Sequence, residues 1–481
     1  MKTVNLRFLI SIRLLSLFRN FLILMAVSII ASAAFVACGD NGDDPEGGGS
    51  SGGGKGKVWV DIEGGKKNVA YSDLNEAINS IKKAGKYTVR VGENQKLSFM
   101  LIISKSGVDV TIKADNKPVE ITMNSMFPMD DYIFITVLDG ASLTLDKGIT
   151  LKGMGKNERS TAVVANESEL IINEGATITN FGNNYQKDTN PGMEAVIVVG
   201  LKNTKFIMNG GAIRKNFKRA LSVNNYADFI MNGGIISENI TIETHGGAGV
   251  VVYNWAIFTM NGGEISGNEA INDYIQGGGE GGGVSLANGS VGATFNMKGG
   301  TIANNIAEKG GGVYVYDSNN EGAKFNLEGG TITGNEADTG GGVYVDGFNN
   351  VSDHYSGIFN MKGGTIEKNT AGAGGGVFYE GKFTMTGGLI AANTASSSGG
   401  GVAGGPFQNS FTKKGGIITG YGDTNANKVI ISGVLPNNRS VGHAVTTGYM
   451  KVREFTANEK TDLDSGISGN AGGWDNAFEP K

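Results

Sequence analysis

Cysteine, histidine and proline are scarce in this sequence. Its 481 residues include one cysteine, three histidines and seven prolines. A single cysteine excludes an internal disulfide framework. The histidines (His245, His354 and His443) lie far apart and lack the spacing of metal ligands, so neither a metal site nor a cofactor is expected.

An excess of charge of one sign is also missing. The formal net charge is −5 and no long basic patch occurs, so nucleic acid is not an expected partner. A hydrophobic content of 40% is enough for a packed core, which argues against wholesale disorder. Glycine is abundant, with 79 copies, but it has no period of three, and a collagen-like chain is therefore excluded.

The N-terminal segment predicts export and anchoring. It begins with four basic residues, Lys2, Arg7, Arg13 and Arg19, before the apolar run FLILMAVSIIASAAFVA, which ends at Cys38. Residues 1–37 resemble a bacterial lipoprotein signal peptide, which implies cleavage before Cys38 and lipidation of its thiol. The resemblance departs at Phe35, where leucine is usual. An uncleaved transmembrane anchor is the alternative, because the run is long enough to span a bilayer. Residues 38–56, rich in glycine, serine and acidic residues, predict a flexible tether.

A repeat with the kernel F-x-M-x-G-G-x-I-x-x-N recurs from Phe206 onward. Its copies begin at Phe206, Phe229, Phe258, Phe295, Phe325, Phe359 and Phe383, with a degenerate copy at Phe411. Successive copies start 23 to 37 residues apart, which places insertions in loops between fixed kernels. The sequence therefore predicts one repetitive body with regular repeats over residues 206–420.

Each repeat predicts one coil of a parallel β-helix. Alternation of apolar and polar residues with a period of two indicates short strands, whereas glycine at this density disfavours helices. A propeller blade would need about 40 residues or more. In one coil Phe295, Met297, Ile302, Val313 and Val315 should fill the interior, with glycines at the corners. We expect three parallel sheets.

The last residue of the kernel predicts a ladder inside the solenoid. An asparagine recurs at the equivalent bend of seven repeats: Asn216, Asn239, Asn268, Asn305, Asn335, Asn369 and Asn393. Stacked amides that bond from one coil to the next explain this recurrence.

The units GGTIxxN and GGGVYV resemble right-handed parallel β-helix proteins of the pectin-lyase-like class. They are similar to GGxIxxN-repeat adhesin-like lipoproteins and polymorphic outer membrane proteins of bacteria. The resemblance implies an all-β, three-sheet solenoid over residues 87–455, with an N-terminal cap over 57–91. In YSDLNEAINSIKKAG helical spacing predicts a capping helix over about 72–84, with Ser72 as N-cap and Gly85 at its end. Residues 456–481 are expected to form a C-terminal cap or tail.

An enzyme is the alternative that this class requires us to weigh. Polysaccharide lyases of the class use an arginine base, but no arginine occurs between Arg219 and Arg439. A hydrolase needs two carboxylates about 5 to 9.5 Å apart. The glutamates of the repeats fall at non-equivalent positions, as Glu264, Glu328, Glu336 and Glu367, and are interpreted as solubilising charges. The N-terminal coils are less regular, and a catalytic groove there remains an alternative.

An aromatic stripe is the candidate binding surface. The middle residue of the V-x-V strand is aromatic in three consecutive coils, as Tyr314, Tyr344 and Phe378, and should point outward. Such a stripe could bind a glycan or a host protein, or it could only stabilise the sheet through cross-strand pairs. The string GGGEGG at residues 277–282 lacks the strand–helix setting of a dinucleotide site.

Together these features predict a non-catalytic lipoprotein of the bacterial envelope. We expect a monomer, lipid-anchored through Cys38 in the outer membrane and exposed at the surface, that presents a β-helix for adhesion to, or recognition of, glycans or host matrix proteins. A lyase or glycoside hydrolase, or a purely structural envelope protein, remains the alternative.

Overall fold

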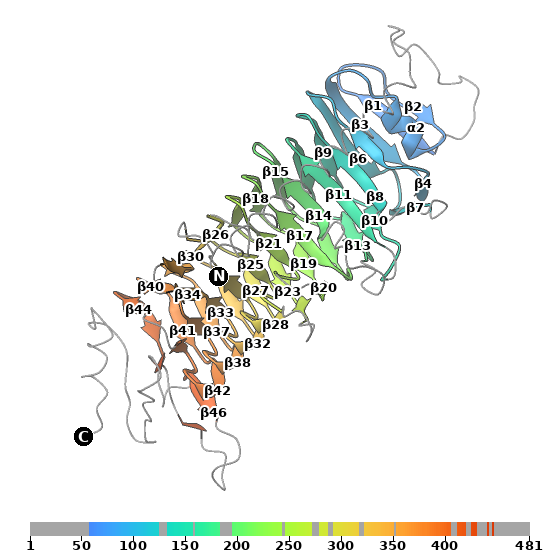
Figure 1. Cartoon of the computed structure of the whole chain (residues 1–481). Coiled ribbons are helices and arrows are strands. Elements are labelled where there is room, and N and C mark those ends of the chain that lie inside the picture. The colour runs from blue at the N-terminus through green and yellow to red at the C-terminus, as the bar shows by residue number, and fades with distance from the viewer. Residues whose placement is uncertain are drawn as a thin grey trace, which may run out of the picture. The chain divides into compact units, whose positions relative to one another are not determined.

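A computed structural model describes residues 57–446 of the chain. Gaps lie at 125–131, 157–158, 183–194, 243–245, 272–278, 287–291, 317–321, 351–352, 406–410, 420–424, 431–439 and 442–444. The chain divides into two units, 1–53 and 54–481, and all described residues belong to the second. That unit is a parallel β-helix, in which each coil adds one strand to each of several stacked sheets (Figure 1).

Sheet A carries the F-x-M part of each repeat. Its strands follow in the order β2 (Val69–Tyr71), β1 (Val58–Ile62), β3 (Gly85–Val91), β6 (Val108–Ala114), β9 (Ser142–Leu145), β12 (Glu169–Ile172), β15 (Lys205–Met208), β18 (Asp228–Met231), β22 (Ile257–Met260), β26 (Thr294–Met297), β30 (Lys324–Leu327), β36 (Ile358–Met361), β40 (Lys382–Met385) and β44 (Phe411–Lys413). From β3 onward the pairing is parallel, whereas β1 pairs antiparallel with both β2 and β3.

Sheet B follows the glycine pair of each repeat and contains its isoleucine. Its strands are β4 (Gln95–Leu97), β7 (Val119–Met123), β10 (Ile149–Lys152), β13 (Thr177–Thr179), β16 (Ala212–Arg214), β19 (Ile235–Ser237), β23 (Glu264–Ser266), β27 (Thr301–Ala303), β31 (Thr331–Thr333), β37 (Thr365–Glu367), β41 (Leu389–Ala391) and β45 (Ile417–Ile418).

Sheet C follows the glycine triplet and contains the V-x-V strands. Its strands are β5 (Leu101–Ile103), β8 (Tyr132–Val137), β11 (Ser160–Asn166), β14 (Ala195–Gly200), β17 (Arg219–Val223), β21 (Val250–Val252), β25 (Val284–Leu286), β29 (Val313–Val315), β33 (Val343–Val345), β39 (Val377–Tyr379), β43 (Val402–Gly404) and β48 (Val445–Thr446). A hairpin of β34 (Gly347–Asn350) and β35 (Asp353–Ser356) leaves the coil after β33.

A fourth sheet, sheet D, corrects the prediction of a three-sheet solenoid. It lies between sheets B and C in the chain and comprises β20 (Ile240–Thr241), β24 (Glu269–Ala270), β28 (Ile306–Lys309), β32 (Glu336–Thr339), β38 (Thr370–Ala373), β42 (Thr394–Ser398), β46 (Lys428–Ile430) and β47 (Ser440–Val441). Most of its buried residues are alanines, such as Ala307, Ala337 and Ala371. Because alanine gives only a weak apolar signal, the sequence predicted no strand between the asparagine and the glycine triplet of each repeat.

The interior of the solenoid is built as predicted. Phe295, Met297, Ile302, Val313 and Val315 are all fully buried. Each pairs in register with its counterpart in the next coil, from Phe325 to Val345. The phenylalanines of the eight repeats stack face to face, with ring centroids 4.5 to 4.9 Å apart. Apolar burial and in-register stacking therefore fix each coil on the next.

The glycine triplets form corners at which the backbone geometry requires glycine. In the coil of Gly310, Gly311 and Gly312, the first has a φ of +64°, which a side chain disfavours. A Cβ on Gly311 would collide with the carbonyl oxygen of Glu336 in the next coil, and one on Gly312 would lie 2.5 Å from the carbonyl oxygen of Gly342. The triplet therefore permits close stacking rather than forming a phosphate loop.

The N-terminal end contains a helix shorter than predicted. Helix α2 spans Leu74–Asn79, and its N-cap is Asp73, whose side chain accepts a hydrogen bond from the backbone N–H of Glu76. The predicted N-cap, Ser72, instead donates its hydroxyl to the Glu76 carboxylate. Leu74 and other apolar residues of α2 join the main core, where the helix packs against β1, β2, β4 and β5. Its capping role stays a prediction. No helix among the described residues is long and apolar enough to cross a bilayer.

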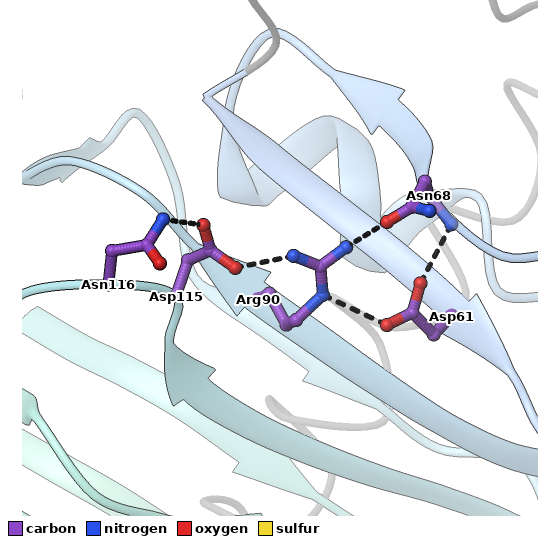
Figure 2. Close-up of polar contacts among 5 residues, drawn as sticks. All are labelled: Asp61, Asn68, Arg90, Asp115 and Asn116. Atoms are coloured by element: carbon purple, nitrogen blue, oxygen red, sulfur yellow. Dashed lines mark hydrogen bonds and ion pairs between the residues drawn. The ribbon is translucent and has the colours of Figure 1, made fainter.

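Arg90 ties the antiparallel strand β1 to the first coils. Figure 2 shows its guanidinium between Asp61 of β1, Asp115 after β6, and Asn68. Nε donates to Asp61 Oδ2 over 2.9 Å, and the guanidinium lies 5.5 Å from the ring centroid of Trp59. Burial raises the pKa of Asp61, but hydrogen bonds from Arg90 and Asn68 outweigh it and lower that pKa below its ordinary value. Two carboxylates therefore hold one cation where the strand pairing of sheet A changes from antiparallel to parallel.

Candidate functional site

The predicted aromatic stripe lies next to one corner of the solenoid. We define the C–A corner as the segments that join each strand of sheet C to the next strand of sheet A, for example 224–227, 253–256 and 346–357. Tyr314, Tyr344 and Phe378 occupy the middle of β29, β33 and β39, paired in register. Their rings stack, with centroids 5.5 and 5.3 Å apart. The structure therefore brings the three predicted residues together in one column.

The prediction that this column is an exposed stripe is wrong for both tyrosines. Tyr314 is 1% exposed and Tyr344 is 4% exposed, while Phe378 is half-buried. The rings lie on the outer side of sheet C, but the preceding glycine corner folds back against them, so that a Cβ on Gly340 would lie 2.9 Å from Tyr344 Cβ. Lys309 also lies over the Tyr344 ring, 5.5 Å from its centroid. Neither tyrosine therefore offers a flat ligand an open ring face.

The two tyrosine hydroxyls bind carboxylates of the following coil. Tyr314 donates to Asp346 Oδ2 over 2.6 Å, and Tyr344 donates to Glu380 Oε2 over 2.6 Å. Asp346 and Glu380 each follow a strand of sheet C directly, so the same contact is repeated one coil further on. Burial and the neighbouring carboxylates raise the pKa of both tyrosines, which therefore stay protonated and donate at neutral pH.

A third carboxylate, Glu280, completes this tyrosine–carboxylate cluster. It stands in the string GGGEGG and forms a β-bridge with Lys309 of the next coil. Burial raises the pKa of Glu280 to about 7, against the opposing charge of Lys309, and Asp346 raises it further. Burial likewise raises the pKa of Glu380. Burial thus brings the pKa of Glu280 close to neutral pH, and Lys309 is the nearby cation.

The cluster is suited to locking one coil onto the next. Each tyrosine hydroxyl is already committed to a carboxylate, and both rings are buried, so the hydroxyls are not free nucleophiles. Among the residues that the structure describes, no group of histidine, cysteine, aspartate and glutamate side chains could hold a metal ion. The geometry favours a structural role for this column.

The recurring asparagines form one continuous internal column. From Asn216 to Asn393 each Nδ2 donates to Oδ1 of the next asparagine over 2.7 to 3.0 Å, and Asn427 extends the column by one member. All are at most 1% exposed. The sequence missed Asn427 because the last repeat is degenerate and its asparagine lies after an insertion.

The four glutamates of the repeats do not come together in one site. Glu264, Glu328 and Glu336 are exposed on different elements, and Glu328 pairs with Lys362 over 3.0 Å. Glu367 is half-buried beside Lys368. Cys38, the signal, the tether, the C-terminal tail, His245 and His443 lie outside the described residues.

Sequence reasoning missed five residues next to the C–A corner. Asp346, Glu380 and Glu280 could have been found by aligning the residues that flank each V-x-V strand. Tyr226 and Trp255 belong to corners of variable length, where alternation gives no signal. They stack on each other with ring centroids 6.1 Å apart.

Comparison of the chain with protein families, curated proteins and solved structures finds no match. The architecture and its side chains are therefore the grounds for a functional proposal.

Proposed function

We propose that this chain is a non-catalytic lipoprotein of the bacterial surface that presents a β-helix for recognition of glycans or host matrix proteins. Lipidation of Cys38 and the tether of residues 38–56 would hold the β-helix at the outer membrane. The observation that carries the proposal is the hairpin β34–β35, inserted at the C–A corner without disturbing the coils on either side.

The hairpin is a clean addition to a standard corner. It leaves the coil after Asp346 and returns at Gly357, whose N–H donates to the Asp346 carbonyl oxygen over 2.9 Å. In the next coil the same connection consists of Glu380 and Gly381 alone. Strands before and after the hairpin pair in normal register, Val345 with Tyr379 and Lys324 with Ile358. The hairpin is therefore not required for packing of the coils, which favours a role in binding a partner.

The test removes the hairpin from the full chain. Deletion of residues 347–356 joins Asp346 to Gly357 and reproduces the Glu380–Gly381 corner, so the variant should fold. Native and deleted chains are compared for binding to a panel of polysaccharides and matrix proteins, with circular dichroism as the control for folding. We expect the native chain to bind at least one member without releasing products, and the deletion to weaken that binding.

Two results would contradict the proposal. Release of shortened sugars from any polysaccharide would indicate an enzyme. Absence of binding to the whole panel, by the native chain displayed at a cell surface, would indicate a purely structural envelope protein.

A further inference from the structure

Two aromatic residues occupy a backbone conformation that side chains disfavour. Tyr226 and Trp255 have φ angles of 67° and 65°, in the left-handed region. Each lies two residues before a strand of sheet A, β18 and β22 respectively. Large side chains are uncommon in this region and carry a conformational cost, so their presence calls for a reason.

The fold itself requires only the left-handed backbone at this position. In seven successive coils the residue two before the sheet A strand has a positive φ: Gly140, Glu167, Asn203, Tyr226, Trp255, Gly292 and Gly322. Three of these are glycine and one is asparagine, the residues that tolerate the conformation best. The aromatic rings occur only in two adjacent coils of this series, and they are not needed to make the turn.

The two rings form a stack that is open at one end. They are nearly parallel, with an interplanar angle of 5° and centroids 6.1 Å apart. On the far side of Trp255 the backbone of Gly292 is so close that a Cβ there would lie 2.6 Å from Trp255 Cε3. On the far side of Tyr226 the equivalent residue is Asn203, so the ring stack ends at Tyr226. Tyr226 is 56% exposed, whereas Trp255 is half-buried.

Polar residues adjoin Tyr226 and Trp255 in the chain and occupy the equivalent corner of the preceding coil. Asn225 accepts a hydrogen bond from Asn254 Nδ2 over 3.2 Å, which fixes the two amides beside the rings. Lys202 and Asn203 are exposed in the preceding corner. An exposed apolar ring face on a corner that also carries amides and a lysine suits a ligand with one C–H face and a rim of hydroxyl groups.

We infer that the exposed face of Tyr226, backed by Trp255, is the stacking site for one pyranose ring of a glycan chain. The axial C–H bonds of a pyranose meet the negative face of an aromatic ring, and its hydroxyls reach the neighbouring polar groups. A protein partner would need about 1,000 Å² or more of complementary surface, which two rings do not supply. The inference rests on the proposed function, because it treats the C–A corner as the recognition edge.

The test uses the full chain and defined oligosaccharides: cellohexaose, xylohexaose, mannohexaose, chitohexaose and hexagalacturonate. Binding is measured by titration calorimetry and by tryptophan fluorescence, with adenosine as a planar ligand that is not a sugar. The decisive variant is Tyr226→Gly, because glycine already occupies the same position in three coils. Tyr226→Phe keeps the ring without its hydroxyl, and Phe99→Ala removes an aromatic side chain that is similarly exposed, at 55%.

We expect the native chain to bind at least one hexasaccharide more tightly than adenosine. Tyr226→Gly should weaken that binding by about tenfold or more, whereas Tyr226→Phe and Phe99→Ala should stay within about twofold. Thermal unfolding should change little in Tyr226→Gly, which shows that lost binding is not lost folding.

Three results would overturn the inference: native affinity in Tyr226→Gly, equal loss in Phe99→Ala, or tighter binding of adenosine than of every sugar. Failure of the native chain to bind any hexasaccharide would also overturn it. If a matrix protein then binds through the hairpin β34–β35, the proposed function stands while the glycan site falls.

Discussion

Replacement of Asn335 by alanine tests whether the asparagine column stabilises the solenoid through burial. Asn335 Oδ1 accepts from the backbone N–H and from Nδ2 of Asn305, both over 2.9 Å. Its own Nδ2 donates to Ile302 O and to Asn369 Oδ1 over 3.0 and 2.9 Å. The residue is fully buried. Asn335→Ala therefore leaves two donors of Asn305 without an acceptor where water cannot replace it.

The expected magnitude follows from these two donors. An unsatisfied buried polar group costs about 1–3 kcal/mol, so the free energy of unfolding should fall by roughly 2–6 kcal/mol. Asn360 is the matched control, because its Nδ2 donates to Asn326 Oδ1 over the same 2.9 Å on the half-buried outer face of sheet A. Water can replace that bond, so Asn360→Ala should cost less than about 1 kcal/mol.

The assay is urea unfolding of the full chain, followed by circular dichroism. The slope of free energy against urea should be unchanged, because both variants expose the same surface on unfolding. Equal losses in the two variants, or a loss below about 1 kcal/mol for Asn335→Ala, would refute the argument that burial rather than the amide bond itself is decisive.

Three further predictions concern corners and the tyrosine–carboxylate cluster. The pKa of Glu280 is raised from 4.5 to about 7, so its contribution to stability is full below pH 4.5 and is lost as pH rises through about 7. At 1.36 kcal/mol per pH unit, native stability should fall by at most about 3 kcal/mol over this window, and urea unfolding of Glu280→Gln should lack this fall. Gly311→Ala should lower the free energy of unfolding by about 3 kcal/mol, because its Cβ meets the backbone of the next coil. Gly64→Ala, which has open space around its Cβ, should lower it by about 1 kcal/mol. Similar losses in urea unfolding of the two variants would contradict the steric argument. Tyr314→Phe leaves Asp346 without its hydroxyl donor and should lower the thermal midpoint by about 1–4 °C. An unchanged midpoint would show that this hydrogen bond does not stabilise the coil.

The coil itself could be predicted because its signals repeat. The positions of Phe295, Met297 and Ile302 are apolar in all seven regular copies, and their spacing indicates which face of each strand is buried. The recurring asparagine marked the internal column for the same reason. Sheet D was missed because its inward residues, such as Ala307, are too small to stand out from a loop.

Exposure could not be predicted from alternation alone. Alternation correctly places Tyr314 and Tyr344 on the outer side of sheet C. It does not indicate that the glycine corner and Lys309 cover them there. Tyr226 and Trp255 were missed because they belong to corners, where the sequence has no periodicity. Their left-handed backbone and mutual stacking become visible only when adjacent coils are laid on each other.

The asparagine column has a consequence for how this gene can change in length. Each amide from Asn239 to Asn393 donates to the next asparagine and accepts from the preceding one. Each of these coils therefore offers the same donor on one face and the same acceptor on the other. A coil that is duplicated or lost by in-frame recombination therefore meets neighbours with matching groups. Related chains should differ by whole repeats, with their ends retained, and size should vary more readily among them than the kernel sequence.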